Sequence, residues 1–123
     1  MPLIPHADAR RTETPNAVMT TLASPTQGGA ARSLWRVDMG PGAAGPAHAF
    51  DAEQLWTMLE GAATLELDGV RHPLAAGDTV VIPAAAPRRV QTDGGFAAIV
   101  TAPAGTRALL ADGTDRGVPA WIA

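Results

Sequence analysis

The chain has 123 residues, with 12 acidic and nine basic side chains and a formal net charge of −3. This length is typical of one domain, and the basic residues form no block of like charge, which argues against a nucleic-acid groove or an anionic membrane surface. Cysteine, tyrosine and lysine are absent, which excludes thiol nucleophiles, tyrosine acids and Schiff-base lysines. No apolar run approaches the roughly 18 residues of a membrane helix, and none follows Arg10-Arg11 as a secretion signal requires. We therefore expect a cytoplasmic protein with no membrane or nucleic-acid partner.

Short strands are predicted along most of the chain, because 13 glycines and 11 prolines interrupt it every few positions and leave little room for helices. The strand candidates are residues 17–23, 33–39, 54–60, 63–68, 70–74, 79–82, 88–92 and 96–101. Asp68-Gly69 predicts a hairpin turn between two of these strands, and Gly94-Gly95 predicts another between the last pair. Many short strands with turns at near-regular intervals predict a single all-β domain, a sandwich or a small barrel.

Residues 47–60 also fit a helix. They contain no glycine or proline, and Asp51 and Gln54 have the spacing of a helix capping box. Four apolar residues of this segment fall on one helical face: Ala49, Ala52, Trp56 and Leu59. The local pattern therefore leaves helix and strand open.

Two motifs in the middle of the chain resemble the signatures of the cupin family. In the first, Gly42, His48 and Gly61 stand at the family's spacing. Phe50 occupies the position of the family's second histidine, and Gln54 that of its glutamate. The resemblance favours a strand from Gln54 onward, in which Gln54, Trp56 and Met58 share one face because strand side chains alternate.

The second motif matches the family at Gly77 and Pro83. Ala85, Arg88 and Thr92 stand where the family has glycine, histidine and asparagine, so its last metal-binding histidine is replaced by an arginine. The resemblance implies a cupin-like jelly-roll β-barrel, a double-stranded β-helix, over residues 1–123. We expect its core at residues 33–102, after a leader of residues 1–27 with one edge strand.

The resemblance also defines a candidate site whose metal ligands are degenerate. Cupins typically hold a divalent metal with three histidines and one glutamate, and only His48 remains here. Arg88 is a cation that donates hydrogen bonds and accepts none, so it opposes a metal beside it. We expect no metal cofactor, although Glu53 or His6 folding into the site leaves a divalent metal open.

The altered residues instead favour a pocket for a small organic anion. Arg88 could hold a carboxylate or enolate, and His48 could transfer a proton at neutral pH. The other residues expected to contact the ligand are Phe50, Gln54, Trp56 and Met58. We expect a metal-independent isomerase, lyase or cyclase acting on a small organic acid.

Several alternatives stay open. The protein could be a non-catalytic small-molecule-binding module, or a metal-dependent cupin dioxygenase with a reduced ligand set. His48 could be a wall residue without chemistry, and Arg88 could pair with Glu53 or Glu66. The aromatic residues and Met58 could serve only as core packing, and His72 could be a solvated loop residue.

A homodimer is expected from the leader. Residues 17–23 have strand character but lie outside both motifs. Exposed sheet edges need covering, and a two-fold contact covers the edge in both copies at once. We therefore expect residues 17–23 to pair along a sheet edge at a two-fold interface.

Overall fold

The fold is nearly all β. The computed structural model describes residues 2–123. Its elements are η1 (His6–Asp8), β1 (Arg10–Glu13), β2 (Val18–Ala23), β3 (Arg32–Met39), β4 (His48–Phe50), β5 (Gln54–Leu67), β6 (Val70–Ala75), β7 (Thr79–Ile82), β8 (Arg88–Gln91), β9 (Phe96–Pro103) and β10 (Ala108–Leu110). Within that range no helix has the length and apolar character needed to cross a bilayer.

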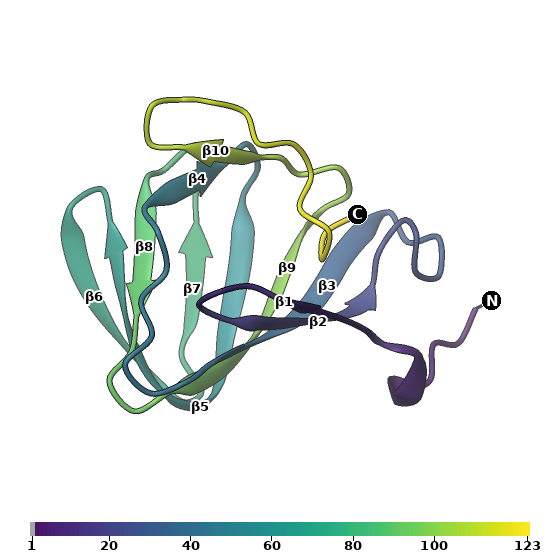
Figure 1. Cartoon of the computed structure of the whole chain (residues 1–123), viewed down its shortest axis with the longest axis horizontal. Coiled ribbons are helices and arrows are strands. Elements are labelled where there is room, and N and C mark those ends of the chain that lie inside the picture. Colours follow the sequence, from purple (N-terminus) through teal and green to yellow (C-terminus); the bar gives the residue numbers. More distant parts are fainter. Residues whose placement is uncertain (1) are drawn as a thin grey trace.

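The strands form one curled antiparallel sheet whose two halves face each other (Figure 1). One half has the order β1-β2-β3-β9-β5 with β7 also on β5, and the other continues from β5 through β8 and β4 to β10, with β6 also on β5. This is the single-domain jelly-roll barrel that the resemblance implies, so the fold prediction is confirmed.

Strand β5 belongs to both halves, which corrects the expectation of separate strands at residues 54–60 and 63–68. Its first part pairs with β7 and β9, and its last part pairs with β6 and β8. A bulge between Met58 and Glu60 inserts one extra residue, so the inward residues change from even-numbered before the bulge to odd-numbered after it. The sequence reads as two strands because this phase change interrupts the alternation.

The core lies between the two halves and follows strand alternation. In β3 the odd-numbered residues from Ser33 to Met39 are buried, while the residues between them are half-buried. Among the largest fully buried side chains are Trp35, Met58, Leu65 and Ile82. Residues 47–60 form β4 and the start of β5, so the strand alternative is correct for this segment.

Two turn predictions have different outcomes. Asp68 and Gly69 both have positive φ, 49° and 80°, and connect β5 to β6 as the hairpin that was predicted. Gly94-Gly95 does not join a hairpin, because β8 pairs with β4 and β5 whereas β9 pairs with β3 and β5. The chain crosses here from one half of the barrel to the other.

The leader contains two strands, not one. β2 does not lie at a sheet edge, because it pairs with β1 on one side and β3 on the other. A turn at Thr14, whose hydroxyl accepts hydrogen bonds from the backbone N–H of Asn16 and Ala17, folds β1 onto β2. The edge strand is therefore β1, whose polar sequence gives no apolar alternation to predict it from; the dimer stays a prediction.

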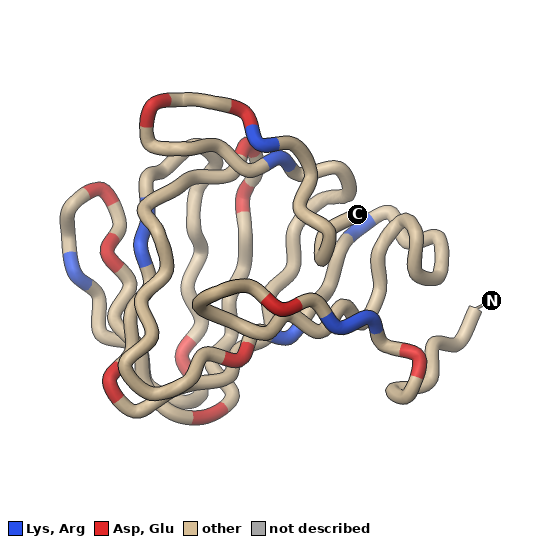
Figure 2. Tube along the Cα trace, in the orientation of Figure 1, with Lys and Arg blue, Asp and Glu red and all other residues tan. Residues whose placement is uncertain are grey.

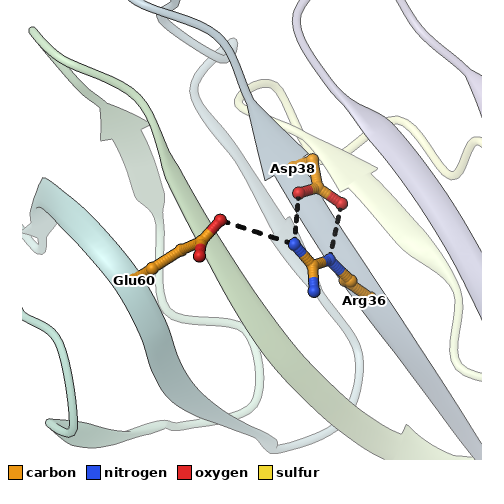
Figure 3. Close-up of polar contacts among 3 residues, drawn as sticks. All are labelled: Arg36, Asp38 and Glu60. Atoms are coloured by element: carbon orange, nitrogen blue, oxygen red, sulfur yellow. Dashed lines mark hydrogen bonds and ion pairs between the residues drawn. The ribbon is translucent and has the colours of Figure 1, made fainter.

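Charged residues are dispersed over both loops and strands (Figure 2). One group lies on the outer face of the barrel, where Arg36 forms a two-point ion pair with Asp38 and lies 3.6 Å from Glu60 (Figure 3). Arg36 and Asp38 belong to β3 and Glu60 to the bulge of β5, with Ala97 of β9 between them. The small Ala97 side chain leaves room for these contacts across β9, although exposed pairs of this kind contribute only about 0–1 kcal/mol each.

Gly61 lies where β5 closely approaches the start of β9, and its substitution tests whether this approach is required for stability. Its φ is +75°, and a Cβ added there would overlap the carbonyl oxygen of Gly95 and lie 2.8 Å from the Cα of Phe96. We expect Gly61→Ala to lower the free energy of unfolding by about 3 kcal/mol or more in urea denaturation, since both backbone strain and a backbone clash result. The matched control is Gly69→Ala, which has φ +80° but no atom within 4 Å of the added Cβ and should cost about 1 kcal/mol. Equal losses in the two variants would show that the close approach of β5 and β9 is not required.

Candidate functional site

The candidate site is an interior cavity of about 370 Å³ between the two halves of the barrel. His48 of β4 and Arg88 of β8 are direct partners in an antiparallel pair, so their side chains share one face of the sheet. Gln54 and Trp56 enter from the facing part of β5, where alternate residues are buried. The fold thus brings His48, Phe50, Gln54, Trp56 and Arg88 to the lining of one cavity.

Met58 is the one predicted site residue that does not line this cavity. It shares the inward face of Gln54 and Trp56, as expected, but lies deeper and is 1% exposed in the core. His6, Glu53 and His72 are all exposed, and none lines the cavity. His72 lies on β6 and not in a loop.

Strand alternation aims Arg88 into the barrel and Arg89 out of it, as β8 has a buried, exposed, buried pattern at residues 88–90. Arg88 is 5% exposed. In residues 2–123 no acidic side chain pairs with it, so the alternative of an ion pair with Glu53 or Glu66 is not formed. Its Nε and Nη1 atoms are buried without any hydrogen-bond partner from the described residues.

Aromatic rings take the place of a counter-charge around Arg88. The guanidinium carbon lies 4.3 Å from the centroid of the Phe50 ring and 5.9 Å from that of Trp56. Such contacts stabilise a cation by about 0.5–2 kcal/mol. They do not offset its burial, which lowers the pKa of Arg88 to about 9. At neutral pH the cavity wall therefore contains a buried cation for which the described residues provide no counter-charge.

His48 contributes an imidazole ring to the cavity wall. Its Nδ1 lies 2.8 Å from the carbonyl oxygen of Pro46. A carbonyl can only accept, so Nδ1 carries the proton, and in the neutral ring Nε2 is left with its lone pair. Burial and the charge of Arg88 lower the pKa of His48, against an opposing effect of the Pro46 hydrogen bond. His48 is thus neutral at pH 7.

Gln54 adds another donor. Its Oε1 accepts a hydrogen bond of 3.2 Å from the indole Nε1 of Trp56, while its Nε2 is buried without a partner among the described residues. Of the polar side chains at the family's ligand positions, Arg88 and Gln54 thus carry unpartnered donors, and His48 carries an acceptor at Nε2. This arrangement suits a ligand with a negatively charged, hydrogen-bond-accepting group and a proton to give up.

The residues at the family's metal-ligand positions do not fit a divalent cation. Phe50 has no donor atom, the oxygen of Gln54 is engaged by Trp56, and Arg88 brings positive charge to the position of a ligand. Across residues 2–123 no group of three or more acidic or histidine side chains is placed to hold a metal ion. Glu53 and His6 are exposed and do not line the cavity, so neither completes such a site.

Sequence reasoning missed the cavity wall contributed by the two ends of the chain. Thr14, Asn16 and Met19 of the β1–β2 hairpin line it on one side, and Leu109 and Trp121 of the C-terminal segment on another. That segment is held by buried hydroxyls, since Thr21 Oγ1 donates to the carbonyl oxygen of Trp121 and Ser33 Oγ to that of Ile122. These long-range contacts leave no local signal, except that Trp121 is one of only three tryptophans.

The chain belongs to the cupin family. The family model for the cupin domain matches residues 35–102, more than half of the chain. The comparison with curated proteins finds no match.

Solved structures share the fold. The polyketide cyclase RemF from Streptomyces resistomycificus superposes with a TM-score of 0.75 and 21% identity, over 97% of this chain and 86% of that chain. An RmlC-like cupin from Shewanella frigidimarina NCIMB 400 gives 0.69 and 20% identity, over 79% and 85%. The DMSP lyase DddQ from Ruegeria pomeroyi DSS-3 gives 0.74 and 24% identity, over 87% and 63%. At these identities the likeness establishes the fold alone.

The donor set predicts weak metal binding. Purified protein should contain far less than one equivalent of iron, manganese, nickel or zinc by mass spectrometric metal analysis. Restoring the family's ligands with Phe50→His, Gln54→Glu and Arg88→His together should raise the metal content, because the backbone already presents these positions to one cavity. Near-stoichiometric metal in the native protein, lost in His48→Ala, would contradict this reading.

Arg88 is expected to reduce stability. Arg88→Met should raise the free energy of unfolding at pH 7 by about 1–3 kcal/mol, because it removes a buried cation that has no counter-charge. The matched control is Arg89→Met on the outer face of the same strand, which should change stability by about 0.5 kcal/mol or less. If Arg88→Met instead destabilises the protein strongly, the guanidinium has a partner that the site geometry does not show.

The effect of the Arg88 charge on the free energy of unfolding can also be measured as a function of pH. Above about pH 9 the folded state releases the Arg88 proton, whereas the unfolded chain, with an ordinary arginine pKa, still holds it. The unfolded state then binds more protons, so stability rises with pH in this window. With no lysine, tyrosine or cysteine titrating there, the rise should be visible in the native protein and absent from Arg88→Met.

Proposed function

We propose that this cupin binds a small organic anion in its interior cavity and acts on it by proton transfer without a metal ion. Arg88 and Gln54 anchor the negatively charged group, His48 is the acid or base, and the apolar walls surround the rest of the molecule. The reaction class is that of an isomerase, lyase or cyclase on an enolisable acid.

The observation that carries the proposal is the unpaired guanidinium of Arg88. A buried charge normally has a partner because its desolvation is costly. Arg88 has two buried N–H-bearing atoms without a partner in the described chain, and Nε2 of Gln54, which lines the same cavity, is unpartnered as well. A carboxylate or enolate oxygen entering the cavity would satisfy both side chains at once, by charge-assisted hydrogen bonds.

The chemistry that follows is proton abstraction from a carbon next to a carbonyl group. His48 Nε2 takes the proton, the electron pair of the broken C–H bond moves onto the carbonyl oxygen, and the resulting oxyanion is held by Arg88 and Gln54. Returning the proton to another carbon completes an isomerisation. Expulsion of a leaving group from the adjacent carbon, with the proton retained on His48, gives a lyase reaction.

The neighbouring structures supply limited support for this class. One is called a polyketide cyclase and another a DMSP lyase. Fold alone does not define chemistry, so the proposal rests on the side chains of this chain.

A second candidate, a non-catalytic binding module, is favoured by one observation. No aspartate or glutamate lines the cavity within the described chain, which leaves His48 as the single group there able to accept a proton. Catalysis with one such group requires it to act as both base and acid. Binding and catalysis therefore have to be tested separately.

Binding is tested with 2-naphthoate and its neutral isostere 2-naphthamide, measured by isothermal titration calorimetry. We expect the native protein to bind the carboxylate and to prefer it to the amide, and Arg88→Met to weaken carboxylate binding by about 10-fold or more. Arg89→Met should leave the affinity unchanged. Equal affinities for the two ligands, or carboxylate binding that survives Arg88→Met, would contradict the anion site.

Catalysis is tested by deuterium incorporation into an enolisable acid, phenylpyruvate, followed by NMR in heavy water. Native protein should accelerate the exchange, and His48→Gln should reduce the acceleration by about 100-fold or more while 2-naphthoate still binds. Because the pKa of His48 is lowered by burial, its base form should persist, and exchange stay fast, until the pH falls below the ordinary histidine range near 6.5. Carboxylate binding without acceleration in the native protein would favour the binding module.

A further inference from the structure

Trp56 makes a hydrogen bond that decides which way the Gln54 side-chain amide faces. The indole Nε1 lies 3.2 Å from Gln54 Oε1, and the two residues are two positions apart on the same face of β5. An indole N–H can donate but cannot accept, so the amide atom beside it must be the oxygen. The amide nitrogen then lies on the other side, where it has no partner in residues 2–123.

Without this bond the amide could turn and present its oxygen to the cavity. That oxygen is an acceptor, and Arg88 has unpartnered N–H groups on Nε and Nη1. Its guanidinium carbon lies 5.9 Å from the centroid of the Trp56 ring. A turned amide would compete with a bound anion for the N–H groups of Arg88. Its oxygen would also repel the negative oxygens of the anion. It would also offer a neutral ligand an acceptor for its own N–H group.

We propose that Trp56 is the specificity-determining residue of this site. Through its indole N–H it holds Gln54 as a hydrogen-bond donor and so keeps the cavity selective for anions over their neutral amide counterparts. The proposal rests on the proposed anion binding, and it assigns Trp56 a positioning role through Gln54, beyond its apolar contribution to the cavity wall.

The test is a double-mutant cycle on the affinities for 2-naphthoate and 2-naphthamide, measured by calorimetry. Trp56→Phe keeps an aromatic ring in place but removes the N–H, and Gln54→Met removes the amide while keeping an unbranched side chain. Trp56→Phe alone should weaken 2-naphthoate by about 3- to 10-fold and leave 2-naphthamide unchanged or tighter. In the Gln54→Met background the same substitution should change neither affinity by more than about 2-fold, because there is no amide left to turn.

Trp121→Phe is the matched control, because Trp121 also lines the cavity but is not bonded to Gln54. It should change the two affinities by similar factors. Equal weakening of both ligands by Trp56→Phe, or an effect of the same size in the Gln54→Met background, would overturn the positioning role while leaving the anion site intact. If the native protein itself does not prefer 2-naphthoate to 2-naphthamide, the result contradicts the anion site instead.

A measurement without ligand tests the positioning role of Trp56 independently of the proposed anion binding. In the NMR spectrum of the isotopically labelled protein, the Trp56 indole N–H proton should shift upfield in Gln54→Met, because its acceptor is gone, while Arg88→Met should leave the indole bonded. If the indole signal is the same in the native protein and in Gln54→Met, Trp56 does not orient the Gln54 amide, whatever ligand the cavity binds.

Discussion

The structure depends on a change of phase within one strand. β5 pairs with both halves of the barrel, and its inward residues would face the wrong way in one of them if its alternation were continuous. The bulge after Met58 and the positive φ of Gly61 reverse the facing between the two parts. Gln54 and Trp56 before the bulge and Leu65 after it can therefore all point inward. The cavity exists because the first part of β5 is held in this phase against β9.

The charges of the side chains at the family's metal-ligand positions determine the chemical character of the site. The positions at which cupins typically carry metal ligands here carry an aromatic ring, an amide and a guanidinium, with one histidine retained. A metal site needs converging lone pairs, whereas at these positions Arg88 and Gln54 carry unpartnered N–H groups, and the free lone pair is that of His48. The positions are those of the family's ligands, but the side chains on them do not suit a cation.

Much of the fold and of the candidate site was predictable from the sequence, and the predictions that were wrong or incomplete have physical causes. The motif spacing gave the barrel and placed His48, Gln54 and Arg88 together, because strand alternation is a local property. The continuity of β5 was hidden by its bulge, and β1 by its polar residues. The inward face of Met58 was correct, but whether an inward side chain reaches a cavity depends on what packs over it. The walls formed by Asn16 and Trp121 arise from long-range contacts.

The changes at the ligand positions also depend on one another. An arginine at position 88 alone would be a buried cation facing an imidazole and a carboxylate. With Phe50, its guanidinium lies against an aromatic ring, at 4.3 Å from the centroid. With Gln54 in place of a glutamate, no carboxylate neutralises it, and the bond from Trp56 turns the amide oxygen away. Each of these residues thus replaces a group that would otherwise bond Arg88, so together they leave its Nε and Nη1 without a partner in the described chain.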